Sequence, residues 1–332
     1  MFLCMWMIRV ALLLVPLQAQ APPAEAQGPP AALRKAERAP QGPVEAEMQN
    51  VLYHVDDQVV LRIAHLRGAL DPTSRDAPPW FDDPKSFSLA IDSGEVAIDP
   101  ASLSALLNRY VFNYDDSPLK RLKVTIEKGQ LKQSGTLHKG IDLPFTIRAE
   151  LSATPDGRLR LHPTSVKVAG IPVKGLMHTL GIELENLVKV RPGTGVEIDK
   201  DDFLLAPAGL LPPPKIQGRV TAVRLEDDEI VQVFGGSKRE AGRKRLRPSD
   251  PAARNFMFYR GRVLRFGKLT MVDADLQIVD ADPKDPFDFY LSHLNEQLVA
   301  GESHNQPDFG LVTVMPDYSD LPRKVSTAGK SK

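Results

Sequence analysis

The stretch RLKVTIEKGQLKQSGTLHKGIDLPFTIRAELSATPDGRLRLHPTSVKV, residues 121–168, alternates between apolar and polar side chains. Leu122, Val124 and Ile126, for example, are separated by polar or charged residues. A period of two places the apolar side chains on one face of a strand. Glycine-containing turn signals punctuate the run at Gly129, Gly140 and Gly157. The stretch therefore predicts a four-stranded antiparallel meander whose single apolar face must be covered by another layer.

Two apolar stripes at helical spacing could supply that layer. Asp99 followed by Pro100 predicts a helix N-cap and a proline in the first turn. The first stripe consists of Leu103, Leu106, Leu107 and Tyr110. The second follows Pro172 and consists of Val173, Leu176, Leu180, Leu184 and Leu187. Gly181 predicts a bend in the second helix, because an interior glycine costs about 1 kcal/mol relative to alanine.

Alternation resumes after the second stripe. Strands are expected at residues 196–205, 216–225 and 229–234, the last two joined by an acidic turn. The segment AGLLPPP, residues 208–214, must lie at an edge or in a loop, because proline cannot donate to a ladder. Residues 256–279 alternate again, and Asp285-Pro286 predicts a third helix. Its apolar residues would be Phe287, Tyr290, Leu291, Leu294 and Leu298. The whole pattern predicts an α+β fold with a C-terminal β/α extension.

The N-terminal residues 1–21 have the layout of a secretory signal, with Arg9 before an apolar run. Cleavage after Ala19, Ala21 or Ala26 is open. A retained membrane anchor is the alternative, but the run falls short of the roughly 20 apolar residues of a spanning helix. We expect an exported protein of a bacterial periplasm or outer envelope. The only cysteine, Cys4, lies in the signal, which leaves the mature chain without a thiol for a disulfide or a metal.

Composition divides the remaining chain into expected segments. Residues 22–47 are rich in Pro and Ala and predict a disordered tether, and residues 323–332 predict a frayed tail. Between them we expect a lipid-binding-like unit at residues 48–236, a basic flexible loop at 237–250, and a segment 251–322 that completes the same domain.

Charge and motifs exclude several function classes. The chain has 42 Lys plus Arg and 42 Asp plus Glu, so no global field would draw it to nucleic acid. No hydrolase, nucleotide-binding or zinc-protease motif is present, and the seven histidines are scattered. We therefore expect no enzyme activity, cofactor or metal. Ser303 and His304 are adjacent, which argues against a catalytic pair, and a loop after a helix is their expected setting. Aspartates at 273–288 lack the spacing of a calcium loop.

The basic run SKREAGRKRLRP, residues 237–248, has two interpretations. A solvated flexible loop is the commoner meaning of such a run. Alternatively, it contacts an anionic membrane surface, at about 1 kcal/mol per basic residue. The candidate membrane-contact residues are Lys238, Arg239, Arg243, Lys244, Arg245 and Arg247.

The order of elements resembles bacterial secreted phospholipid-binding proteins related to the tubular lipid-binding superfamily. The resemblance covers about residues 86–234. It rests on the helix within SFSLAIDSGEVAIDPASLSALLNRYVF, on LPF and DGRLRL in the meander, on GIPVK opening the second helix, and on the connection LLPPPKI. It implies a TULIP-like half-tube, in which a strongly curved antiparallel sheet wraps around long amphipathic helices with a lipid inside.

The apolar faces could either fill a core or leave a slot for acyl chains, which bind by burial at about 0.8 kcal/mol per CH₂. We expect an exported protein that holds a phospholipid or similar envelope lipid, with transport between membranes as one use. The alternative is a non-enzymatic structural or adaptor module with a filled core; a lipid or glycan hydrolase ranks last. The candidate groove-lining residues are Leu103, Leu106, Leu107, Tyr110, Leu122, Val124, Ile126, Phe145, Ile147, Leu151, Leu176, Leu180 and Leu184.

Overall fold

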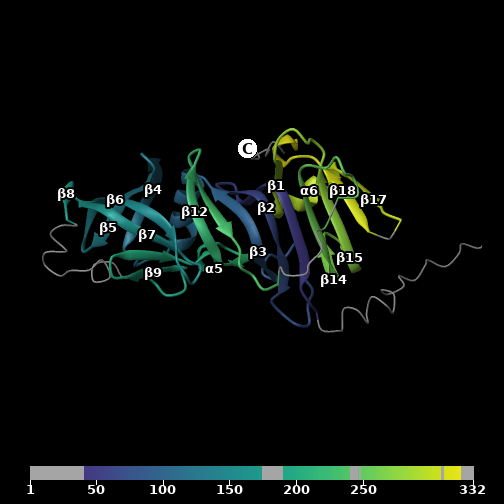
Figure 1. Cartoon of the computed structure of the whole chain (residues 1–332), viewed down its shortest axis with the longest axis horizontal. Coiled ribbons are helices and arrows are strands. Elements are labelled where there is room, and N and C mark those ends of the chain that lie inside the picture. The colour runs from purple at the N-terminus through teal and green to yellow at the C-terminus, as the bar shows by residue number, and fades with distance from the viewer. Residues whose placement is uncertain (1–40, 174–189, 240–245, 247, 308–309, 323–332) are drawn as a thin grey trace, which may run out of the picture.

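The computed structural model describes residues 41–173, 190–239, 246, 248–307 and 310–322. Strands account for 57% of these residues and helices for 11%. The molecule is elongated, with a smaller sheet at one end and a larger sheet extending from the middle to the other end (Figure 1). The predicted α+β half-tube is therefore wrong: the described chain is mostly β-sheet and has no long amphipathic helix for a sheet to wrap around.

The larger sheet joins the two ends of the described chain. Its main path runs β12-β13-β3-β2-β1-β14-β15-β18-β17. The bounds are β1 (Val44–Asp56), β2 (Val59–Pro72), β3 (Phe87–Ile98), β12 (Val220–Glu226), β13 (Glu229–Phe234), β14 (Phe256–Phe266), β15 (Leu269–Asp280), β17 (Glu302–Asn305) and β18 (Leu311–Met315). Two strands lie off this path, β11 (Lys215–Gly218) parallel to β3 and β16 (Phe287–Tyr290) parallel to β1. The C-terminal segment thus completes the sheet that the N-terminal strands begin.

The smaller sheet contains the predicted meander. Its order is β4-β5-β6-β7-β10-β9, with β8 beside β7. The bounds are β4 (Leu119–Glu127), β5 (Gln130–Lys139), β6 (Ile141–Ala153), β7 (Leu159–Val168), β8 (Ile171–Pro172), β9 (Val196–Asp199) and β10 (Asp202–Leu205). Consecutive antiparallel pairing of β4 through β7 confirms the four-stranded meander. The strand predicted at residues 196–205 is instead a hairpin of two short strands.

The predicted helices fare differently. The first begins as expected, because Asp99 Oδ1 accepts hydrogen bonds from the amides of Ala101 at 2.7 Å and Ser102 at 2.9 Å. It is short, however: α2 (Pro100–Leu106) passes into a π-helical turn, η1 (Leu107–Val111). The second predicted helix lies outside the described residues, apart from Val173. In the described part of the chain, no helix is both long and apolar enough to cross a membrane.

The third predicted helix is wrong over its first half. Phe287 and Phe289 alternate with Asp288 and form β16, which pairs with β1 through Val51↔Phe287. Both phenylalanines are buried, at 0% and 1% exposure, so packing in the core overrides the helical spacing. Helical structure follows only in η2 (Leu291–His293) and α6 (Leu294–Ala300); the remaining short helices are α5 (Pro207–Leu210) and η3 (Tyr318–Asp320).

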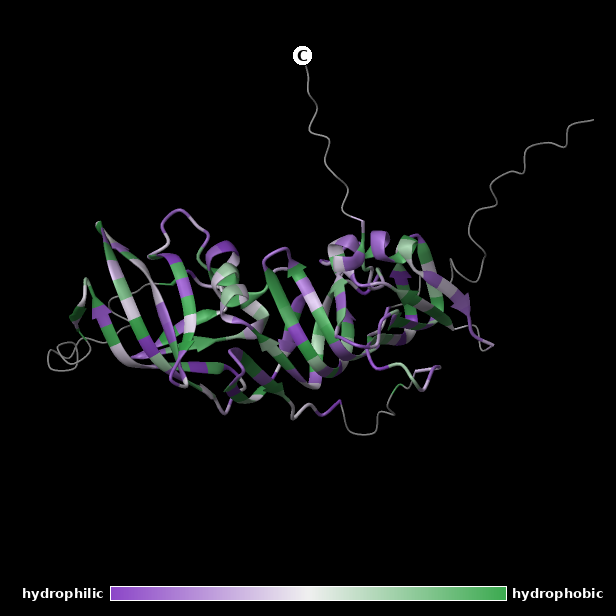
Figure 2. Ribbon diagram, turned by 90° about the horizontal axis from the view of Figure 1, so that it is seen from above, coloured by the Kyte–Doolittle hydropathy of each residue, from purple (hydrophilic) through white to green (hydrophobic). Residues whose placement is uncertain are grey.

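The sheet begins earlier than the sequence indicated. Residues 44–47 fall within the predicted disordered tether, but β1 starts at Val44, and Val44 and Ala46 are buried. Their alternation with Glu45 and Glu47 is the period-two pattern of a half-buried strand. Similar alternation of apolar and polar residues is visible along many strands of both sheets (Figure 2). The ordered unit therefore extends into the predicted tether.

Helix α2 and the turn η1 tie the two sheets together. The Val60 amide on β2 donates to Ser102 Oγ at 3.2 Å, and the Val124 amide on β4 donates to Ser104 Oγ at 2.8 Å. Asn108 pairs with Leu122 on the same edge strand: the Leu122 amide donates to Asn108 Oδ1 at 2.8 Å, and Asn108 Nδ2 donates to the Leu122 carbonyl at 2.7 Å. These side chains satisfy backbone groups at the otherwise open edge of β4.

Replacing Asn108 by alanine should destabilise the protein by about 1–3 kcal/mol, because two backbone groups of Leu122 lose their partner. Urea denaturation measures the free energy of unfolding. The matched control is Asn113→Ala, at an exposed position just beyond the same turn. Equal stability of the two variants would show that Asn108 does not hold the edge of β4.

Candidate functional site

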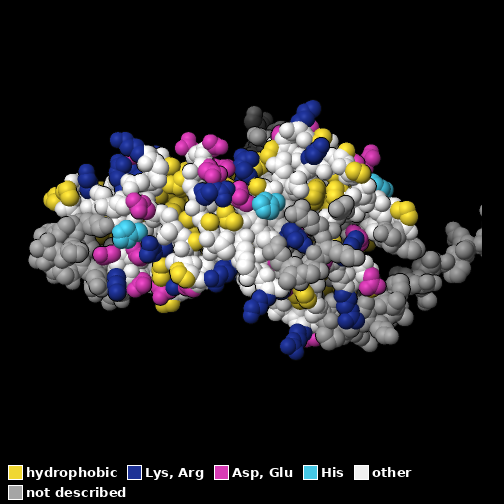
Figure 3. Space-filling model, viewed as in Figure 1, with side chains coloured by type: hydrophobic (Ala, Val, Ile, Leu, Met, Phe, Trp, Pro, Cys, Tyr) yellow, Lys and Arg dark blue, Asp and Glu magenta, His cyan; other side chains and the backbone are white. Residues whose placement is uncertain are grey.

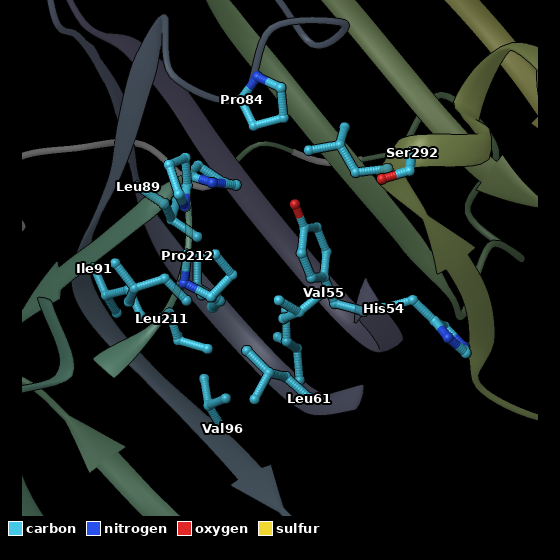
Figure 4. Close-up of a pocket in the computed structure, with 17 residues that line it drawn as sticks. His54, Val55, Leu61, Pro84, Leu89, Ile91, Val96, Leu211, Pro212 and Ser292 are labelled. Carbon is cyan, nitrogen blue, oxygen red and sulfur yellow. The ribbon is translucent and has the colours of Figure 1, made fainter. Parts of the chain in front are cut away.

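An apolar cavity lies on the face of the larger sheet where β1, β2 and β3 adjoin. Apart from space open to solvent, its volume is about 50 Å³. It is lined by Tyr53, His54, Val55, Leu61, Ile63, Leu66, Pro84, Leu89, Ile91, Val96, Leu211, Pro212, Pro213, Pro214, Ile216, Leu291 and Ser292. In the close-up, Leu89, Ile91, Leu211 and Pro212 lie on one side, with His54 and Ser292 at the opposite end (Figure 4). The cavity is narrow and is lined mostly by apolar side chains.

The floor of the cavity follows from strand register. Ile63 on β2 lies opposite Val96 on β3, and Leu61 lies opposite Tyr53 on β1. Cross-strand partners share one face of a sheet, so these side chains form a continuous apolar surface.

The cover of the cavity follows from the proline run. Residues 212–214 are three successive prolines, which lack the amide hydrogens needed to join a ladder. Pairing starts just after them, where Ile216 on β11 lies beside Leu89 on β3. The preceding residues 211–214 line the cavity from the loop before this strand. The prediction that AGLLPPP avoids a central strand is confirmed, since it forms α5 and a connection.

Tyr53 supplies the principal polar group of the cavity. Its ring packs on Phe289, with 5.8 Å between ring centroids. Burial raises the pKa of the Tyr53 hydroxyl well above its ordinary value. The side chain retains partial exposure because it faces the cavity. Among the described residues, the structure shows no hydrogen-bond partner for this hydroxyl. A protonated donor thus faces a hydrocarbon-walled space.

His54 marks the end of the cavity beside β16. Its Nε2 lies 2.5 Å from Asp288 Oδ1, and its ring stacks on Tyr290 with 5.2 Å between centroids. Burial alone would raise the pKa of Asp288, but interactions with His54 and the Ser319 amide outweigh it and hold the pKa below its ordinary value. This pair joins the side chains of β1 and β16 beside the cavity.

The described groove residues predicted from the sequence lie away from this cavity. Six belong to the hydrophobic core: Leu106, Leu107, Leu122, Val124, Phe145 and Ile147. Leu103, Ile126 and Leu151 are partly buried and pack against it. Tyr110 is 37% exposed, and its hydroxyl donates to Asp56 Oδ2. Leu176, Leu180 and Leu184 lie outside the described residues. None of the ten described residues among them lines the cavity on the larger sheet.

The candidate membrane-contact residues are only partly described. Lys238 and Arg239 are exposed, whereas Arg243, Lys244, Arg245 and Arg247 lie outside the described residues. Arg239 is engaged by the protein itself, with ion pairs of 3.0 Å to Asp71 and 3.1 Å to the buried Asp92. On the face shown in Figure 3, basic and acidic side chains are interspersed. Membrane contact by this run stays a prediction.

Two further sequence features can be placed. Ser303 and His304 lie on strand β17, not in the expected loop, and Ser303 Oγ lies 3.0 Å from Thr313 Oγ1. In the described ranges, no group of three or more His, Cys, Asp or Glu residues is arranged to hold a metal ion.

No protein-family model matches the chain, and no curated protein or solved structure matches it significantly. The resemblance to secreted phospholipid-binding proteins is therefore untested by these comparisons.

Proposed function

We propose that this protein binds one apolar molecule, such as a single acyl chain, in the cavity between β1–β3 and the proline run. The observation that carries the proposal is the cavity itself, enclosed by aliphatic side chains with few polar groups, which is the usual construction of a small-molecule site. Because the cavity volume is only about 50 Å³, a single chain fits better than a two-tailed phospholipid. On the basis of the sequence, the proposal also holds that the protein is exported and that it binds this molecule without catalysing a reaction.

Burial supplies the driving force. At about 0.8 kcal/mol per CH₂, six buried methylenes would contribute about 5 kcal/mol before the costs of association. Such a ligand needs no charged partner, which agrees with the absence of Lys, Arg, Asp and Glu among the described lining residues.

A structural or adaptor module of the cell envelope is the second candidate. It is favoured by the smaller sheet, whose apolar residues on β4, β5 and β6 are packed into the core. Under this alternative, the cavity on the larger sheet would be a packing gap with no affinity for a ligand.

Straight-chain alkanes from hexane to decane test the proposal. A ligand that binds only the folded state raises the unfolding temperature, so we expect a rise that grows with chain length until the slot is full. Val96→Phe should abolish the rise because it fills the cavity from β3, and Leu211→Phe should do the same from the covering segment.

The control is Val272→Phe, at a position 39% exposed and away from the cavity, which should keep the alkane response. The proposal fails if the wild-type protein shows no rise, or if the filled and control variants respond alike.

A further inference from the structure

From the same cavity, and resting on the proposed function, we infer that the ligand is uncharged and carries one hydrogen-bond acceptor, such as a ketone or ester oxygen, which receives the Tyr53 hydroxyl. This defines a narrower class than apolar molecules in general. It assigns Tyr53 as the specificity-determining residue.

The hydroxyl of Tyr53 requires a partner. Tyr53 is partly exposed, and an apolar ligand in the cavity would exclude water from its hydroxyl. A hydroxyl that loses water without gaining a hydrogen bond costs about 1–3 kcal/mol. The nearby Tyr259, whose pKa is raised first by burial and then by the neighbouring Tyr53, directs its hydroxyl to Met257 Sδ at 3.7 Å. Tyr53 has no comparable partner among the described residues and lines the cavity. A ligand oxygen would supply the hydrogen-bond acceptor that the Tyr53 hydroxyl lacks among these residues.

The Tyr53 hydroxyl is protonated and can act as a hydrogen-bond donor. A tyrosine hydroxyl keeps its proton at neutral pH even at its ordinary pKa, and burial raises the pKa of Tyr53 further. It can then donate to a carbonyl oxygen. A hydrocarbon offers it no acceptor, so an acceptor-bearing ligand gains a hydrogen bond that the hydrocarbon lacks.

The charge of the ligand follows from the other lining residues. Apart from Tyr53, the only titratable side chain among the described lining residues is His54, and its Nε2 already lies against Asp288. In the described part of the chain, no Lys or Arg lines the cavity, so a carboxylate there would lose its hydration without gaining either of these cations, a far larger cost than burying a neutral carbonyl. The cavity therefore favours a ketone or ester over a fatty acid anion.

Binding of octane, 2-octanone and octanoate to the full chain at pH 8, measured by calorimetric titration, tests the inference. The wild-type protein should bind 2-octanone about 10-fold more tightly than octane, and octanoate more weakly than 2-octanone. In Tyr53→Phe, octane affinity should stay within about two-fold, while the preference for 2-octanone falls to near parity. Tyr259→Phe removes a buried hydroxyl outside the cavity and should leave that preference intact.

The outcomes separate the two proposals. If octane binds but 2-octanone shows no preference, or the preference survives in Tyr53→Phe, the inference is wrong while the proposed function stands. Binding of octanoate as tightly as 2-octanone would overturn the assignment of an uncharged ligand. If none of the three compounds binds the wild-type protein, the proposed function and the inference fall together.

Discussion

Gln297→Leu is expected to lower the free energy of unfolding by about 3 kcal/mol or more, the largest loss among the substitutions considered. Gln297 lies on α6 with 0% exposure and makes three hydrogen bonds to backbone groups. Its Oε1 accepts from the Tyr290 amide at 3.0 Å, and its Nε2 donates to the carbonyls of Asp288 at 2.9 Å and Pro316 at 3.0 Å. Leucine leaves all three groups unpaired, at about 1–3 kcal/mol each.

Chemical denaturation of this variant should be compared with Gln49→Leu, which places the same leucine at an exposed position on β1. The control is expected to change stability by less than about 0.5 kcal/mol. A loss no larger than that in Gln297→Leu would mean that the three bonds do not hold β16 and the segment before η3 against α6.

Asp317→Asn is expected to stabilise the protein at pH 8 by on the order of 2 kcal/mol, and to leave its stability nearly unchanged at pH 4. Asp317 is only 6% exposed, and its Oδ1 accepts from the Asp288 amide at 2.6 Å. Burial, with the nearby carboxylates of Asp280, Asp285 and Asp288, raises the pKa of Asp317 to about 7. Asparagine keeps the acceptor oxygen and removes the charge.

The sign follows from proton binding. Between the ordinary pKa of an aspartate and about 7, folded Asp317 holds a proton that the unfolded chain has released. Its contribution to stability is therefore lost as pH rises through this window and stays lost above it. Urea denaturation at pH 4, 6 and 8 should show the advantage of Asp317→Asn growing with pH. Asp320→Asn, at an exposed position in η3, should show no such trend. A pH-independent difference between wild type and Asp317→Asn would contradict the raised pKa.

Local signals in the sequence were sufficient for local structure. The meander of β4 to β7 was predicted because alternation and turn glycines act over a few residues. The turn between β12 and β13 was found in the same way, and Asp227 and Asp228 adopt positive φ values of 46° and 61° there. The N-cap Asp99 was also correctly identified.

The architecture depended on pairings that no local pattern reveals. β1 lies beside β14 with Glu47 opposite Phe258, and β16 joins β1 because Phe287 and Phe289 enter the core. Residues this far apart carry no shared period. Because of tertiary packing, residues 287–290 form a strand where a helix was expected. The α+β prediction is wrong because the described chain is mostly strand and has no long amphipathic helix.

The candidate site was missed for a related reason. Periodicity shows which face of a strand is apolar, but it cannot show whether the covering layer fills the space above it. For Leu122 and Phe145 the cover is complete, whereas above Leu61 and Val96 it leaves a cavity. The sequence signal for the cavity is the proline run at 212–214. These prolines cannot join a β-ladder, and they line the cavity from the loop before β11.

Organic extraction of the wild-type and Val96→Phe proteins, purified side by side from the organism that makes them, tests the central claim most directly. Mass spectrometry of the extracts should find one uncharged, oxygen-bearing apolar molecule at near-equimolar amount in the wild-type protein and little of it in Val96→Phe. The account would be contradicted by wild-type protein that carries no such molecule, or by equal amounts in both extracts.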